Sequence, residues 1–169
     1  MISLKRKEYR LHNITENDFW AHLDDITVGQ NINPEIGCFT PFHGKFENVF
    51  GGRKVKNKFS IFLYRPITRE FWTKILAKGQ VSIDDKKECV IIDCRFEIPF
   101  WSILILLLLG LLFVTPFYFI TLNIGIIINS IFLLIYGLIL KSNYHNIVNE
   151  LKKQFNKISD VEIPNIRTL

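Results

Sequence analysis

Hydrophobic positions follow three different patterns along this chain of 169 residues. Between residues 45 and 96 short runs alternate apolar with polar positions, as at Phe59, Ile61 and Leu63, and such alternation predicts half-buried strands. Residues 98–140 are almost continuously apolar. Further on, Ile147, Leu151 and Phe155 recur at the spacing of an amphipathic helix. The pattern therefore predicts a β-rich region, a long apolar block and a C-terminal helix.

The apolar block is long enough for two membrane spans. All 21 basic and all 16 acidic residues lie outside residues 98–140, and one span needs about 20 apolar residues. We expect spans at about 100–120 and 122–140, with the bend near Pro116 because proline removes a helical hydrogen bond. The alternative is a helical hairpin buried in a soluble core. It is disfavoured because a chain of this length could hardly cover so much apolar surface.

The region before the block, residues 1–97, predicts one short helix followed by strands. Thr15 can cap a helix with Asp18 in a weak capping box, and Phe19 and Leu23 share one helical face. Strands are predicted at 38–47, 48–56, 58–65, 71–83 and 88–96. Five short strands in succession favour a small antiparallel β meander or barrel. The predicted fold is an α+β membrane protein, in which a transmembrane helical hairpin and an amphipathic C-terminal helix follow this cytoplasmic β-rich domain.

Residues 141–169 are predicted to form a cytoplasmic amphipathic tail. Its apolar stripe includes Val148 beside the three positions already named, and Lys152, Lys153 and Lys157 lie on other faces. We favour the interpretation that the stripe packs on the β domain or continues the second span. Alternatively it could bind anionic lipid at the interface or pair with a second copy of the chain.

The distribution of charge predicts how the chain lies in the membrane. The net charge is +5, and the chain has only three cysteines, which excludes a disulfide-rich secreted protein. Basic residues stand on both sides of the apolar block, and none lies in the loop between the two expected spans. The positive-inside rule therefore predicts a multi-pass protein of the inner (plasma) membrane with both termini in the cytoplasm.

A basic stretch in the β-rich region is the main candidate for a binding site. Residues 45–78 contain nine basic and two acidic side chains. Three interpretations remain open: a solvated sheet face, attraction to anionic lipid headgroups, or a pocket for a phosphorylated ligand. No nucleic-acid-binding motif accompanies the charge, so nucleic acid is not expected as a partner. The candidate ligand- or lipid-binding residues are Arg53, Lys54, Lys56, Lys58, Arg65, Arg69 and Lys74.

No motif in the chain predicts catalysis. The histidines and cysteines lack metal-ligand spacing, and there is no phosphate-binding loop, nucleophile elbow or pair of catalytic carboxylates. We therefore expect neither an enzyme nor a metal or cofactor. Asn129 and Ser130 are the polar residues of the second expected span. Such residues hydrogen-bond between helices, either within the hairpin or between copies, which would give a homo-oligomer.

Two motifs carry a resemblance to known proteins. The runs Phe42-His43-Gly44-Lys45-Phe46 and Phe71-Trp72-Thr73-Lys74-Ile75, placed before two spans, resemble a diffuse family of small uncharacterised bacterial membrane proteins. The architecture is also similar to bacterial anti-phage effectors that join two spans to a β-barrel, although in those proteins the spans come first. The first interpretation is a membrane anchor that holds a β domain for protein or lipid interaction. The second is a ligand-gated effector that disrupts the membrane when the basic stretch binds a phosphorylated nucleotide messenger.

Overall fold

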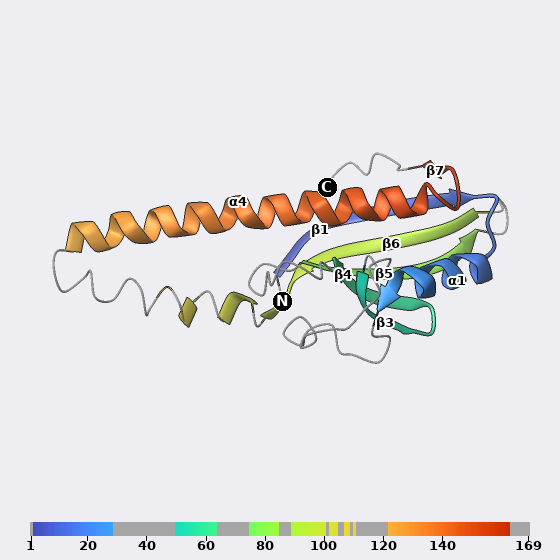
Figure 1. Ribbon diagram of the computed structural model, residues 1–169, viewed down its shortest axis with the longest axis horizontal. Helices are drawn as coiled ribbons and strands as arrows, with labels where there is room; N and C mark the ends of the chain where they lie inside the picture. Colours follow the sequence, from blue (N-terminus) through green and yellow to red (C-terminus); the bar gives the residue numbers. More distant parts are fainter. Residues whose placement is uncertain are drawn as a thin grey trace.

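The computed structural model describes residues 2–28, 50–63, 75–84, 89–100, 102–104, 107–108, 110 and 122–162. These residues form an α+β fold, as the sequence predicts (Figure 1). Its elements, in chain order, are β1 (Ile2–His12), α1 (Glu16–Ile26), β2 (Thr27–Val28), β3 (Phe50–Val55), β4 (Lys58–Leu63), β5 (Leu76–Asp84), β6 (Cys89–Ile98), α4 (Leu122–Phe155) and β7 (Val161–Glu162).

The strands form one mixed sheet in the order β2-β3-β4-β5-β6-β1-β7. Strands β3 to β6 are consecutive antiparallel neighbours, which confirms the predicted meander. Strand β2 pairs with β3 in parallel, whereas β1 and β7 extend the other side antiparallel. Because β2 and β7 stand at opposite ends of this order, the described strands make an open sheet and not a closed barrel. The strand predicted at 38–47 lies outside the described residues.

Strand β1 was not predicted from the sequence, and its composition explains why. It pairs with β6 from Ile2 opposite Ile98 to His12 opposite Cys89, with an irregularity between Ser3 and Lys5. Only Tyr9 and Leu11 are buried in it. Lysines occupy the earlier positions of the same face, so the period-two pattern is visible only over the last few residues.

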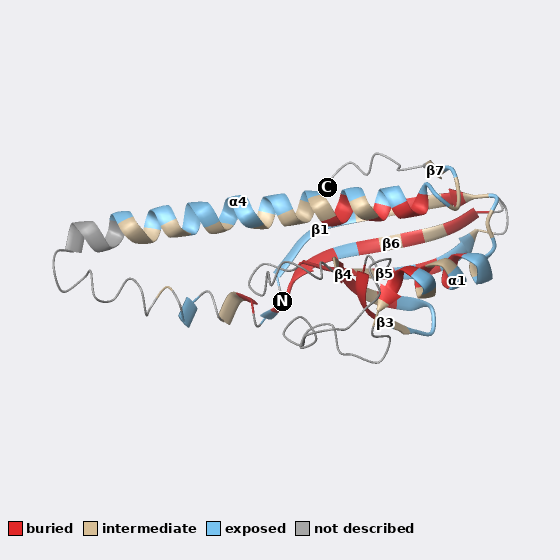
Figure 2. Cartoon of the chain, in the orientation of Figure 1, coloured by how far each residue is buried: buried red, intermediate tan, exposed pale blue. Residues whose placement is uncertain are grey.

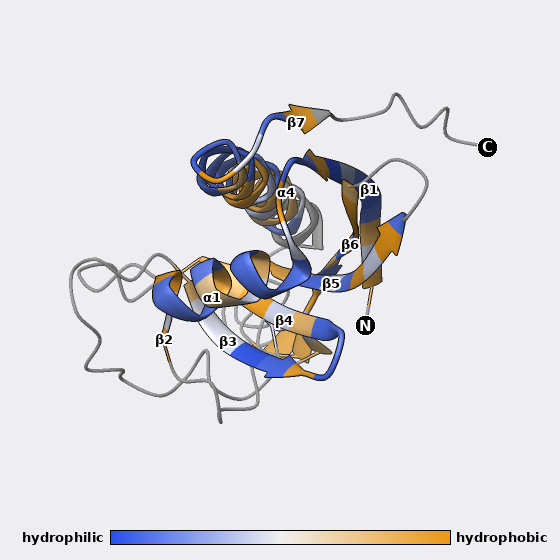
Figure 3. Cartoon of the chain, turned by 90° about the vertical axis from the view of Figure 1, so that its right-hand side faces the viewer, coloured by the Kyte–Doolittle hydropathy of each residue, from blue (hydrophilic) through white to orange (hydrophobic). Residues whose placement is uncertain are grey.

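Helices α1 and α4 pack on the same face of the sheet (Figure 3). Thr15 caps α1 as predicted, because its side chain accepts a hydrogen bond from the Asp18 backbone N–H at 3.2 Å. Phe155, near the end of α4, is fully buried, and its ring centroid lies 5.3 Å from that of Tyr9 and 5.9 Å from that of Phe19. The core of the sheet domain therefore contains residues that the chain supplies after the apolar block.

Helix α4 joins two segments that the sequence analysis treated separately. It runs for 34 residues and includes the second expected span, 122–140, and most of the expected amphipathic helix. Ile147, Val148, Leu151 and Phe155 lie in the core, which is the arrangement expected if the tail packs on the β domain. The preceding half projects beyond the sheet and is mostly exposed (Figure 2). We call residues 122–140 the apolar half of α4 and residues 141–155 its domain half.

The two-helix hairpin itself is not confirmed. Within the described residues, one helical segment, Ile127–Phe155, is long and apolar enough to cross a membrane by its length and composition. Of the first expected span, 100–120, the structure describes residues 100, 102–104, 107–108 and 110, all helical. The bend expected near Pro116 lies outside the described residues, so the hairpin stays a prediction.

Replacing Gly52 with alanine is expected to destabilise the sheet by about 3 kcal/mol. Gly52 has a φ of 155°, and a Cβ at this position would lie 2.2 Å from the Ser60 carbonyl oxygen and 2.8 Å from the Ile61 Cα. Backbone atoms of a paired strand cannot move aside cheaply. Chemical denaturation of the detergent-solubilised chain measures the loss. Gly137→Ala is the matched control, because nothing lies within 4 Å of its added Cβ, and an equal loss in both variants would contradict the prediction.

Candidate functional site on the charged sheet face

The two faces of the sheet differ sharply in composition. Phe59, Ile61 and Ala77 point with the other core residues towards the helices. Because side chains alternate along a strand, the intervening residues point to the opposite face. We call this opposite side of β1 and β3–β6 the outer face. It carries the charged residues of the meander other than Lys54.

A concavity of about 500 Å³ lies on the outer face. It extends across four neighbouring strands, from β3 to β6, so residues far apart in the sequence share it. Basic side chains outnumber acidic ones in its lining. The lining residues are Arg53, Val55, Lys58, Phe59, Ser60, Lys78, Gly79, Gln80, Asp93, Arg95 and Glu97.

The register of the strands aligns the basic residues in a single row. Arg53 is paired with Ser60, Ser60 with Lys78, Lys78 with Arg95, and Arg95 with Arg6. We call these five residues the basic row. Side chains directly opposite on adjacent strands are about 5 Å apart, and like charges in that relation destabilise a sheet. The row therefore needs counter-charges, from the protein or from a ligand.

The protein supplies some of these counter-charges from the flanking positions. Asp93 binds Arg6 through both carboxylate oxygens. Glu97, which is only 8% exposed, has its Oε2 atom 3.0 Å from Nζ of Lys78. Both carboxylates of the concavity therefore have a cationic partner already.

Other members of the concavity have no counter-charge among the described residues. Arg53, Lys58 and Arg95 make no ion pair within the part of the chain that the structure describes. The Ser60 Oγ atom is buried there without a hydrogen-bond partner. Three cations and one hydroxyl that have no partner in the described ranges give the concavity the chemistry of an anion-binding site.

The candidate residues of the basic stretch do not share one surface. Arg53 and Lys58 line the concavity. Lys54 faces the other way: its Nζ lies 3.0 Å from Asp24 Oδ2 and 4.8 Å from the centre of the Trp20 ring, so it links β3 to α1. Lys56 lies in the turn between β3 and β4 with a φ of 53°. The remaining candidates, Arg65, Arg69 and Lys74, lie outside the described residues.

Lys78, Arg95 and Arg6 were not predicted from the sequence as site residues. Lys78 lies at the end of the basic stretch, and Arg95 is one of the basic residues that precede the apolar block. Alternation within β6 could have placed Arg95 on the outer face. It could not have placed Arg95 opposite Lys78, because that requires the register between β5 and β6.

The apolar half of α4 contains Asn129 and Ser130. Asn129 is partly exposed and Ser130 exposed. Residues 100–120, expected to hold their partners within the hairpin, are largely outside the described part of the chain. Their role as transmembrane helix contacts therefore stays a prediction.

Titratable groups elsewhere in the described residues do not form a reactive cluster. No group of three or more metal-ligating side chains occurs among them. Burial lowers the pKa of His22, and its neighbour Asp24 is engaged by Lys54. Burial raises the pKa of the Cys94 thiol, which favours its unreactive protonated form.

No protein-family model matches the chain, and no curated protein or solved structure matches it either. The two features from which a function can be inferred are the concavity on the outer face and the exposed apolar half of α4.

Proposed function

We propose that the chain is an integral membrane protein whose α4 crosses the inner membrane and holds the sheet domain at the cytoplasmic face for lipid or protein interaction. The observation that carries this proposal is the contrast between the two halves of one helix. Seven large hydrophobic side chains of the apolar half are 43–64% exposed, whereas the domain half is fixed in the core. The seven are Ile127, Ile131, Leu133, Leu134, Ile135, Leu138 and Ile139.

The energetic cost of this exposure in water supports a lipid environment. Burying a side chain of this size contributes about 1.5–3 kcal/mol, so seven half-exposed side chains forgo roughly 5–10 kcal/mol. That is comparable to the total stability of a typical domain. At 100° per residue, the seven positions cover well over half of the helix circumference. A groove on one protein partner would leave part of this apolar surface in contact with water, whereas a lipid bilayer would cover all of it.

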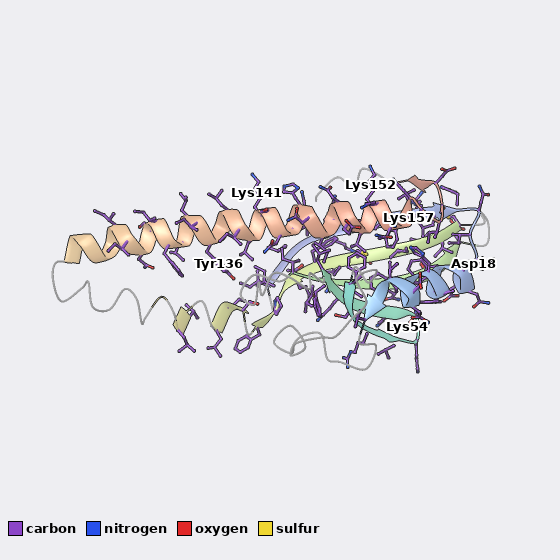
Figure 4. The ribbon with its side chains drawn as sticks, in the orientation of Figure 1. Asp18, Lys54, Tyr136, Lys141, Lys152 and Lys157 are labelled. Atoms are coloured by element: carbon purple, nitrogen blue, oxygen red, sulfur yellow. The ribbon has the colours of Figure 1, made fainter. Side chains whose placement is uncertain are left out.

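The length and charge of α4 are also consistent with a span. The 19 residues of the apolar half extend about 28 Å, close to the hydrocarbon thickness of about 30 Å. Lys141 follows immediately, and Lys152 and Lys157 stand beside the sheet domain (Figure 4). Basic residues gathered on this side support a cytoplasmic position for the sheet domain. Residues 100–120 would supply the first span of the expected hairpin.

Charged substitutions in the apolar half test the proposal. Each arginine or lysine at a span centre costs about 2.5–3.5 kcal/mol, so Ile131→Lys combined with Leu134→Lys is expected to prevent stable insertion. The wild-type chain should stay in the membrane pellet after alkaline carbonate washing, and the double variant should be released.

The matched control places the same charge on exposed positions of the domain half, Ser142→Lys with Asn149→Lys. It is expected to remain in the pellet. Release of the wild-type chain by carbonate as a soluble protein would overturn the proposal.

A second candidate function is a ligand-gated effector that disrupts the membrane. It is favoured by one observation: the core that supports the outer face and the apolar half of α4 are joined by one continuous helix. Ligand binding on the sheet could therefore tilt the apolar half. Cells expressing the chain would lose membrane potential if this function applies, and would keep it if the chain is an anchor.

A further inference from the structure

We propose that the outer face binds a ligand carrying two or more phosphate groups, held by two pairs of cations. One pair is Arg53 and Lys58 on β3 and β4; the other is Lys78 and Arg95 on β5 and β6. The inference deepens the proposed function by naming the chemistry that the sheet domain recognises. It rests on membrane anchoring only where the phosphates belong to a lipid.

The spacing of the two pairs determines the size of the ligand. Lys78 and Arg95 are directly opposite on adjacent strands, so one phosphate between them can contact both. Arg53 lies two strands away from Lys78, which corresponds to about 10 Å at 4.7–4.9 Å per strand. Lys58 stands diagonally across from Arg53 and can reach the same group. A chain of phosphates or a bisphosphate can contact both pairs at once while their side chains stay over their own strands, whereas a single phosphate requires the long side chains of both pairs to converge on it.

Uncharged groups lie between the two pairs. Ser60 occupies the position of the basic row between Arg53 and Lys78, and its buried Oγ lacks a partner in the described residues. Gln80, which lies two residues after Lys78 on β5 and opposite Lys58 on β4, also lines the concavity. A hydroxyl and an amide can hydrogen-bond the central part of a ligand whose two ends are charged. The buried Glu97, through its contact with Lys78, holds that ammonium group near the second phosphate position.

The row lies close to the expected membrane surface. Arg95 precedes Ile98, where the apolar block begins, by three residues, or about 10 Å along β6. Strands β1 and β6 run alongside α4 (Figure 1), and the basic row crosses these two strands at Arg6 and Arg95. The headgroup layer is about 5–8 Å thick on each side of the bilayer. Both soluble polyphosphates and the headgroup phosphates of a bisphosphate lipid can therefore reach the row.

The first experiment tests whether the phosphate groups belong to a soluble ligand. It measures binding to the 169-residue chain reconstituted in nanodiscs of neutral phosphatidylcholine. Tripolyphosphate is expected to bind at least tenfold more tightly than orthophosphate in calorimetric titrations. The lipid arm compares cardiolipin, which has two phosphates, with phosphatidylglycerol, which has one, by native mass spectrometry of the detergent-solubilised protein. Selectivity for either multi-phosphate probe supports the proposal and identifies the source.

Variants locate the binding on the outer face. Arg53→Gln combined with Arg95→Gln removes one cation from each pair and is expected to weaken binding about a hundredfold. Lys152→Gln combined with Lys157→Gln removes the same charge from exposed positions elsewhere and is expected to change binding less than twofold. Circular dichroism checks that each variant is folded, and Arg95→Gln alone replaces the double variant if that one unfolds.

Two results would overturn the inference. One is the absence of any preference for tripolyphosphate over orthophosphate together with none for cardiolipin over phosphatidylglycerol. The other is an equal loss of binding in the outer-face variant and its control, which would indicate net charge alone. Carbonate washing of the same variants reports membrane anchoring separately, so the loss of this site would leave the proposed anchor function intact.

Discussion

Phe155→Ala is expected to lower the free energy of unfolding of the sheet domain by about 3–5 kcal/mol, the range for removing a large buried aromatic side chain. Phe155 is fully buried and packs against Tyr9 of β1 and Phe19 of α1, so it joins three elements at one point. Urea unfolding in detergent, followed by tryptophan fluorescence, measures the change, because Trp20 packs beside Phe19 in the same core.

Leu134→Ala is the matched control for this substitution. Leu134 belongs to the same helix but is 64% exposed, so its truncation removes no contact from the core. The midpoint of unfolding is expected to stay within error of wild type. A similar loss at both positions would show that helix α4 is held by its apolar half and not by the core.

Ser142→Pro is expected to uncouple the two halves of α4. Ser142 is exposed just after the apolar half, and proline there removes a backbone hydrogen bond and clashes with the preceding turn, at a cost of about 3 kcal/mol. Spin labels at Ile131→Cys and Lys152→Cys, in a Cys38→Ser background, are 21 residues apart and should give one narrow distance near 32 Å in the parent chain. The proline variant should give a broader distribution at shorter distances.

Ser142→Ala keeps the helix continuous and is expected to preserve the narrow distance. Cys89 and Cys94 are buried, so they are poor targets for the label. An unchanged distribution in the proline variant would mean that packing around α4, and not helix continuity, fixes the angle between its two halves.

The sequence was most informative where one local rule decides the structure. Thr15 and Asp18 cap α1, and the alternation through Phe59 and Ile61 places β4, because both signals are local. Strand β1 escaped prediction because it owes its place to pairing with β6, which lies 77–96 residues further along the chain, and not to its own pattern. The continuity of α4 was one of two favoured alternatives, because the change from apolar to amphipathic composition does not by itself show whether the tail continues the second span.

The candidate site shows the same division between local and distant information. Arg53 and Lys58 could be chosen from charge density alone. Alternation then distinguishes them from Lys54, which turns towards Asp24 on the opposite face. The basic row depends on four successive strand registers, and no pattern within one segment specifies those. For this reason Arg95 becomes a site residue only when the sheet is seen as a whole.

The core of the sheet domain contains residues from both sides of the apolar block, and this has a consequence for how the chain is synthesised. Strands β1 to β6 leave the ribosome first, but Ile147, Leu151 and Phe155 follow only after the apolar block. At about 5–20 residues per second, the roughly 50 residues between Ile98 and Ile147 take several seconds to synthesise. During that interval the nascent sheet exposes Tyr9 and Phe19 without their partner from α4. If the block inserts as proposed, the core is completed only after the membrane-spanning segment has been made, and the nascent sheet is open to proteolysis until then.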